Sequence, residues 1–119
     1  MKVMATIGTR PDIVKMAPII RALQKNGIPS IGAHCGQHYD YNMSQQFIED
    51  LELNAPDYGY KIKAFSQGEQ TARILTCMER LMKKTHPNLV LVEGDTNGTL
   101  ATALAAVKLG IPVGHVEAG

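Results

Sequence analysis

Three short segments of the sequence place ionisable or hydrogen-bonding side chains where a strand is expected to end. They are Gly-Thr-Arg-Pro-Asp at 8–12, Glu-Gly-Asp-Thr-Asn-Gly-Thr at 93–99 and His-Val-Glu-Ala-Gly at 115–119. In an open α/β sheet, ligands bind at the carboxyl ends of the strands. If the three segments follow strands at one edge of a sheet, their polar groups meet there.

The first segment has the features of a phosphate-binding turn. Gly8 allows a close backbone turn, and a helix that begins near Pro11 offers free N–H groups and the positive end of its dipole. Arg10 adds a cation that can bind phosphate through two hydrogen bonds, and Lys15 adds a second charge. The alternative, in which both cations are solvated surface charges, fits the pattern equally well. Neither G-x-G-x-x-G nor a Walker loop is present, so dinucleotide and P-loop chemistry have no support.

The second segment contains two carboxylates, Glu93 and Asp95, separated by one glycine. An aspartate at this position is more often a helix N-cap than a catalyst. Thr96 and Asn97 could cap the helix instead, which would leave Asp95 without a structural role. With Glu117, Asp95 would form a pair of carboxylates on neighbouring strand ends. Such pairs divide acid and base roles when burial raises one pKa and hydrogen bonds keep the other group ionised.

The histidines give a weaker signal. His34, Cys35 and His38 lie close together, but no Cys-x-x-Cys or His-Glu-x-x-His motif accompanies them. A structural or substrate-facing role is therefore favoured over metal binding, and we expect no metal site. For His86 and His115 we likewise favour a structural role. The sequence shows no recognisable Ser-His-Asp arrangement.

Hydrophobic periodicity predicts the elements that must position these groups. Apolar, β-favouring runs predict strands over 2–8, 28–34, 88–94 and 111–117, and a weak alternating pattern suggests another strand within 55–65. Apolar residues at helical spacing predict helices over 9–27, 41–53, 66–86 and 95–110. The order βαβα(β)αβαβ indicates an α/β fold with a doubly wound parallel sheet and right-handed crossovers. In this order the turns after the first, fourth and fifth strands lie at the same edge.

Several residues mark the ends and faces of the helices. Pro11 suits the first helical position, and Pro18 should kink the same helix one turn after its start. Ser66 and Glu69 have the spacing of a capping box at the start of the helix over 66–86. The face of that helix expected to be buried carries Ala72, Leu75, Met78 and Met82, with Leu81 beside it.

Composition limits the class of protein. With 119 residues, 45% hydrophobic and 19% charged, and a net charge of +1, the sequence describes one modest globular domain. No basic run suggests nucleic acid, and no apolar run approaches the roughly 20 residues of a membrane span. Cys35 and Cys77 have no paired spacing, so we expect reduced thiols and a cytoplasmic protein. The first apolar run is predicted to be a strand and not a signal peptide.

Three segments together closely resemble the UDP-N-acetylglucosamine 2-epimerase family: GTRPDIVKMAPII at 8–20, GQHYDYNM at 36–43, and LVLVEGDTNGTLATALAAVKLGIPVGHVEAG at 89–119. The resemblance covers essentially the whole chain. It implies two Rossmann-like domains arranged as in glycosyltransferase-B enzymes, with the nucleotide sugar between them. Residues 1–119 would then be a partial N-terminal domain, and the C-terminal UDP-binding domain would lie outside them.

The resemblance also implies roles for individual residues. Arg10 and Lys15 would contact the nucleotide sugar, Asp95 would lie at the sugar, and Glu117 would be an acid/base residue. His38 is carried over as a substrate-binding residue near the site. The first motif of the family usually ends in Glu where this sequence has Asp12, a shorter carboxylate that a helix start should accommodate.

The activity implied by the resemblance is the interconversion of UDP-N-acetylglucosamine and UDP-N-acetylmannosamine by elimination and re-addition of UDP, without a cofactor. The 119 residues alone are expected to be inactive, because half of the cleft lies elsewhere. Alternatives are a hydrolysing epimerase, an epimerase of a UDP-diacetamido-uronate, or a non-catalytic flavodoxin-like nucleotide-binding module. The resemblance further implies a cytoplasmic enzyme of cell-envelope polysaccharide biosynthesis and a homodimer. From the composition we expect no nucleic-acid or membrane partner.

Overall fold

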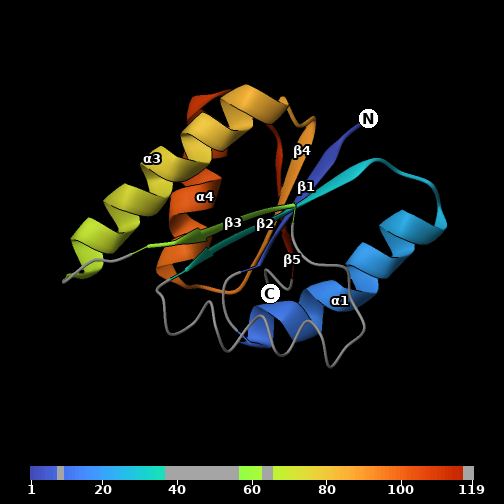
Figure 1. Ribbon diagram of the computed structural model, residues 1–119, viewed down its shortest axis with the longest axis horizontal. Coiled ribbons are helices and arrows are strands. Elements are labelled where there is room, and N and C mark those ends of the chain that lie inside the picture. The colour runs from blue at the N-terminus through green and yellow to red at the C-terminus, as the bar shows by residue number, and fades with distance from the viewer. Residues whose placement is uncertain (8–9, 37–56, 63–65, 117–119) are drawn as a thin grey trace.

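Among the residues that the structure describes, strands alternate with helices as the sequence predicts, except that the segment between the second and third strands is not described (Figure 1). The structure, a computed structural model, describes residues 1–7, 10–36, 57–62 and 66–116. Its elements are β1 (Val3–Ile7), α1 (Arg10–Lys25), β2 (Ser30–Gly36), β3 (Tyr58–Lys61), α3 (Gln67–Thr85), β4 (Leu89–Glu93), α4 (Asn97–Lys108) and β5 (Val113–Val116). The strand predicted within 55–65 is confirmed as β3. The helix predicted over 41–53 lies outside the described residues.

The strands form one parallel sheet in the order β3-β2-β1-β4-β5. All four pairings are parallel, and β1 lies at the centre between β2 and β4. The chain builds outward from β1 to β3 and then returns to the centre to add β4 and β5. The predicted doubly wound sheet is therefore confirmed. The point where the strand order reverses lies between β1 and β4, which is where such sheets bind ligands.

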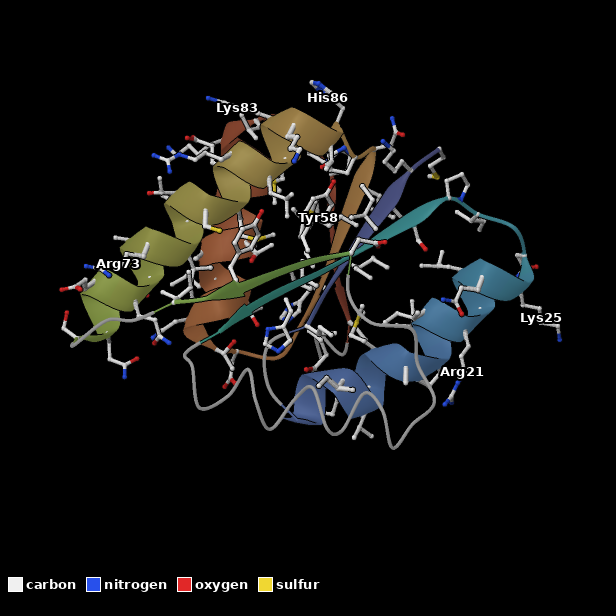
Figure 2. All side chains as sticks on the ribbon, in the orientation of Figure 1. Arg21, Lys25, Tyr58, Arg73, Lys83 and His86 are labelled. Atoms are coloured by element: carbon white, nitrogen blue, oxygen red, sulfur yellow. The ribbon has the colours of Figure 1, made fainter. Side chains whose placement is uncertain are left out.

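Helices cover both faces of the sheet, with α1 on one face and α3 and α4 on the other (Figure 1). Side chains alternate between the two faces along each strand, so Met4 and Val90 pack toward α3 and α4, whereas Ala5 and Leu91 pack toward α1. Figure 2 shows the side chains of Arg21 and Lys25 on α1, and of Arg73 and Lys83 on α3, pointing outward. The sequence thus separates apolar and charged positions by helical face.

The buried face of α3 differs from the predicted one. Its buried residues recur at helical spacing and are Ile74, Met78, Leu81, Met82 and Thr85. Ala72 is exposed, so its predicted place on this face was wrong. The buried stripe begins at Ile74, and Ala72 lies outside it. Ser66 caps the helix by accepting a hydrogen bond from the Glu69 N–H, at 3.1 Å, whereas the Glu69 carboxylate contacts Arg73 at 3.0 Å.

Helix α1 continues through Pro18 over 16 residues. Proline removes one hydrogen bond in a helix interior. The group that loses its partner is the carbonyl of Val14, and both Val14 and Pro18 have exposed side chains. Ile13 and Met16 lie on the opposite, fully buried side. The helix therefore tolerates the proline because its ring lies away from the core.

The amino ends of β1 and β4 are tied together by hydrogen bonds. The Lys2 N–H donates to Asn88 Oδ1 and the Asn88 N–H donates to the Lys2 carbonyl, both at 2.8 Å. The Lys2 ammonium also donates to the Thr85 carbonyl at 2.9 Å. The polar groups at the amino end of the sheet therefore fix the start of β1 against the segment between α3 and β4.

We expect His86→Gly to stabilise the protein. His86 ends α3 in a left-handed conformation, with φ 52° and ψ 57°, and its N–H bonds the Met82 carbonyl. Glycine enters this conformation without the Cβ penalty, which is about 1 kcal/mol. Urea unfolding should show a gain of a few tenths to about 1 kcal/mol. The control His86→Ala keeps the Cβ and should give no gain, and an equal gain from both would contradict the explanation.

Candidate functional site

The carboxyl ends of β1, β4 and β5 lie next to one another at one edge of the sheet. Glu93 at the end of β4 is in register with Val116 at the end of β5. Helix α1 begins at Arg10, shortly after β1 ends at Ile7. The expected meeting of these strand ends is confirmed. Residues 8–9 and 117–119, which complete the first and third segments, lie outside the described residues.

Glu93 is a buried carboxylate at this edge. Its side chain is 3% exposed, and its Oε1 lies 3.4 Å from the ammonium nitrogen of Lys15, whose side chain is 42% exposed. A charge removed from water is strongly unfavourable unless it is paired. The ion pair therefore joins the second turn of α1 to the end of β4 and supplies the positive charge that Glu93 needs.

The alternation of side chains along β4 indicates that Glu93 needs a cation from α1. Along β4, Leu91 and Glu93 share the face that α1 covers, because strand side chains alternate. A carboxylate in the last position of a buried face requires a cation from the element above it. From the sequence, Glu93 was recognised only as a neighbour of Asp95, and its contact with Lys15 was not predicted. The contact depends on the tertiary placement of α1, which local patterns do not specify.

Thr96, and not Asp95, caps α4. The Thr96 hydroxyl accepts a hydrogen bond from the Thr99 N–H at 3.3 Å. This resolves the alternative that the sequence left open. Asp95 has an exposed side chain in the turn between β4 and α4. Its carboxylate is therefore not required for starting the helix.

Side chains from two elements hold the turn after β4. The Thr99 hydroxyl donates to the Glu93 carbonyl, and His115 Nε2 on β5 donates to the Gly94 carbonyl, each at 2.7 Å. Gly94 has φ 81°, a left-handed conformation that glycine adopts readily. His115 thus has the structural role expected for it, because it links the end of β5 to this turn.

A side-chain amide links the starts of α3 and α4. Asn97 Nδ2 donates to Gln67 Oε1 and, at 2.9 Å, to Gln70 Oε1. From the sequence, Asn97 was predicted only as a possible cap of its own helix. The bridge requires α3 and α4 to pack side by side, so it could not be recognised from spacing along the chain.

His34 is a second buried ionisable residue on the α1 face. It is in register with Ile7 and is 1% exposed. Burial lowers the pKa of His34 from its usual 6.5 to about 4, against a smaller opposing effect of its backbone hydrogen bond. The imidazole is therefore neutral near pH 7. No group of three potential metal ligands occurs among the residues that the structure describes.

The structure describes some of the predicted site residues and not others. Arg10 is the first residue of α1 and Lys15 lies one turn further, next to Glu93. Asp95 lies two residues after Glu93. The contact with Glu93 therefore places Lys15 at the same end of β4 as the Asp95 turn. His38 and Glu117 lie outside the described residues, and their roles stay predictions. Cys77 is partly buried against the main core cluster.

The arrangement defines a Rossmann-like doubly wound α/β protein whose polar strand ends meet at the switch point of the sheet. The chain belongs to the UDP-N-acetylglucosamine 2-epimerase family, whose sequence profile matches residues 21–119. No helix among the described residues is long and apolar enough to cross a membrane.

Individual relatives agree with this assignment. A UDP-N-acetylglucosamine 2-epimerase of Methanococcus maripaludis is 49% identical over 118 residues, which are 99% of this chain and 32% of that protein. A UDP-2,3-diacetamido-2,3-dideoxy-D-glucuronate 2-epimerase of Pseudomonas aeruginosa is 43% identical over 120 residues, covering 100% of this chain and 34% of the relative.

A solved structure shows the same fold. The epimerase of Methanocaldococcus jannaschii in complex with UDP-GlcNAc and UDP superposes with a TM-score of 0.93 at 48% identity, over 100% of this chain and 33% of that one. The chain spans about a third of the length of these relatives. It therefore corresponds to one part of a larger enzyme architecture.

We expect Thr96→Ala to destabilise the protein by about 1 kcal/mol, because the Thr99 N–H loses its capping acceptor. Asp95→Asn should leave the free energy of unfolding unchanged within about 0.5 kcal/mol, since this exposed side chain is not the cap. Urea unfolding of both variants measures the difference. A larger loss from Asp95→Asn than from Thr96→Ala would show that the cap had been assigned to the wrong residue.

The stability of the protein should fall as the pH is lowered through the titration of His34. Because the folded-state pKa is about 4 and the usual value is 6.5, the unfolded chain binds more protons between these values. Stability is therefore retained above pH 6.5 and lost below it. Between about pH 7 and pH 5 the loss should be about 2 kcal/mol.

Urea unfolding at several pH values, with His34→Gln alongside, tests this dependence. The variant should lose less stability than the wild type over the same interval, whatever its stability near pH 7. His86→Gln removes an exposed histidine and should keep the wild-type pH dependence. Parallel pH curves for the wild type and His34→Gln would contradict a role for His34.

Proposed function

We propose that residues 1–119 form the nucleotide-sugar-binding part of the N-terminal domain of a UDP-N-acetylglucosamine 2-epimerase. The observation that carries this proposal is the meeting of the α1 start, Lys15 and the Asp95 turn at the carboxyl ends of adjacent strands. A helix start and a cation attract a diphosphate, and a nearby carboxylate can act on the attached sugar. The M. jannaschii relative in complex with UDP-GlcNAc and UDP supports the choice of ligand.

The proposed reaction proceeds by elimination and re-addition. A base removes the C2 proton, the bond between the anomeric carbon and the UDP oxygen breaks, and a 2-acetamidoglucal forms. UDP then adds back through the same oxygen while a proton is delivered to the opposite face of C2. Atoms and charge balance without a cofactor, because the same UDP leaves and returns.

The residues of this chain would act on the two charges that develop. Negative charge grows on the departing diphosphate, and Arg10, Lys15 and the start of α1 would stabilise it. Positive charge grows at the anomeric carbon, and the exposed carboxylate of Asp95 would stabilise that charge. His38 would contact the substrate near the site.

Glu117 would supply one acid/base group of the reaction. Proton transfer on both faces of C2 needs groups on both sides of the sugar, with pKa values brought toward neutrality. A single carboxylate can reach only one face of the sugar. The other groups would correspond to the parts of the longer relatives that this chain does not cover, so we propose that the 119 residues alone have negligible epimerase activity.

Membership of the family supports a proposal about the cellular setting. We propose that the protein works in the cytoplasm, that it supplies an amino sugar for cell-envelope polysaccharides, and that it forms a homodimer. Its partner is a UDP-sugar, and we expect no nucleic-acid or membrane partner. The paired cysteine spacing expected of an exported disulfide protein is missing from the sequence, which supports the cytoplasmic setting.

These 119 residues within a chain of the relatives' length, called the full-length protein below, should give deuterium at C2 and the manno epimer when incubated with UDP-N-acetylglucosamine in deuterated water. NMR of the sugar protons measures both. Asp95→Asn should lower kcat by about 100-fold or more, because the developing positive charge loses its stabilising carboxylate. The control Asp57→Asn alters a carboxylate that accepts a hydrogen bond from the Gly32 N–H at 2.7 Å, and it should keep kcat.

The products distinguish this proposal from its alternatives. Release of free N-acetylmannosamine would indicate a hydrolysing epimerase. Turnover of the UDP-diacetamido-uronate alone would indicate the activity of the P. aeruginosa relative. Neither deuterium exchange nor turnover with any of these sugars would overturn the proposed function and leave a binding module.

A further inference from the structure

Glu93 is an ionisable group at the carboxyl edge that the proposed reaction does not use. It ends β4, lies in register with Val116 of β5, and is 4% exposed as a whole residue. Its Oε1 contacts the Lys15 ammonium at 3.4 Å. A buried acid in contact with a cation that is assigned to the diphosphate must influence how strongly that cation attracts an anion.

The ion pair leaves Lys15 accessible. The Lys15 side chain is 42% exposed and that of Glu93 is 3% exposed, so the lysine is in contact with solvent while the carboxylate is not. A lysine ammonium has three donors and can bind two partners at once. The same ammonium can therefore contact a phosphate oxygen while it stays paired with Glu93.

The charge of Glu93 opposes anion binding at this edge. Because the carboxylate is buried, salt and water screen its field much less than they screen an exposed charge. A phosphate held by Lys15 from the solvent side would lie about 6 to 7 Å from the carboxylate, close enough for appreciable repulsion at the effective dielectric of a protein site. The start of α1 has the opposite effect, because the positive end of the helix dipole attracts an anion.

We propose that Glu93 is a counter-charge built into the site, which weakens the hold of Lys15 on the diphosphate of the nucleotide sugar. This inference rests on the proposed function. In an elimination and re-addition reaction, UDP must be held through the reaction and then released with the sugar. Release of the bound nucleotide sugar often limits kcat, and tighter binding of the diphosphate slows that release, so weaker binding of UDP by Lys15 favours turnover.

Glu93→Gln separates charge from hydrogen bonding. The glutamine oxygen can still accept from Lys15, whereas the negative charge is gone. In the full-length protein we expect Glu93→Gln to bind UDP about 3- to 10-fold more tightly by calorimetry at low salt, with a smaller gain at high salt. The KM for UDP-N-acetylglucosamine should fall by a similar factor while kcat does not rise.

Three controls restrict the interpretation to this charge. Glu93→Asp keeps the charge and should restore the wild-type UDP affinity to within about twofold. Glu69→Gln removes a glutamate paired with Arg73 on α3 and should leave UDP affinity unchanged, although net charge changes equally. Uridine lacks phosphate, so its binding should not respond to Glu93→Gln. Unchanged or weaker UDP binding by Glu93→Gln would overturn the proposal.

A measurement without ligand tests the ion pair itself. Lys15→Met leaves the buried carboxylate without its cation and should raise the unfolding equilibrium constant about tenfold. In the Glu93→Gln background the same change should raise it by less than about threefold, because no buried charge remains. Equal effects of Lys15→Met in both backgrounds would refute the pairing on which the proposal depends.

C2 exchange, UDP binding and the coupling of Lys15 to Glu93 together distinguish failure of this inference from failure of the proposed function. If C2 exchange is intact but Glu93→Gln does not tighten UDP binding, the counter-charge role is wrong and the epimerase assignment stands. If the wild type neither binds UDP nor exchanges the C2 proton while Lys15 and Glu93 are coupled, the proposed function is wrong, and the counter-charge role falls with it.

Discussion

The parallel pairing of β1 with β2 on one side and β4 on the other is the constraint on which the site depends. Two parallel strands cannot be joined by a tight turn, so α1, α3 and α4 each cross one face of the sheet between the strands that they connect. Outward growth from β1 to β3 and later growth from β4 to β5 therefore place α1 and the α3-α4 pair on opposite faces. The same pairing aligns the carboxyl ends of the central strands, where polar residues can meet without disturbing the core.

Patterns that repeat along the chain predicted most of this architecture. The continuous apolar run before Glu93 and the helical spacing in α1 each depend on neighbours in sequence, so strand and helix types were recognisable. The face of α3 was less well predicted, because Ala72 is apolar but small and fits either a buried or an exposed position. The stripe that begins at Ile74 is fixed by the sheet beneath it.

In the candidate site, too, local features were predicted from the sequence and long-range contacts were not. The Asp95 turn was recognised because a carboxylate after a buried strand is a local feature, yet whether Asp95 or Thr96 caps α4 depended on backbone geometry. The contact between Lys15 and Glu93 was missed because the two residues are far apart in sequence. Such contacts depend on which helix covers which strand, and a single sequence contains that information only through the completed fold.

His34 and Glu93 show two physical solutions to one problem on the α1 face of the sheet. Both side chains are almost completely buried, and a buried charge without a partner is strongly unfavourable. His34 avoids the penalty by losing its charge, which is why burial lowers its pKa to about 4. Glu93 meets the penalty with a counter-ion, and the partner is a residue of α1 that also reaches solvent. A neutral histidine adds no field at the edge of the sheet, whereas the paired carboxylate adds a fixed negative charge beside the cation. The electrostatic character of this edge therefore depends on Lys15 and Glu93 together, and a count of its cations alone would overstate its attraction for a diphosphate.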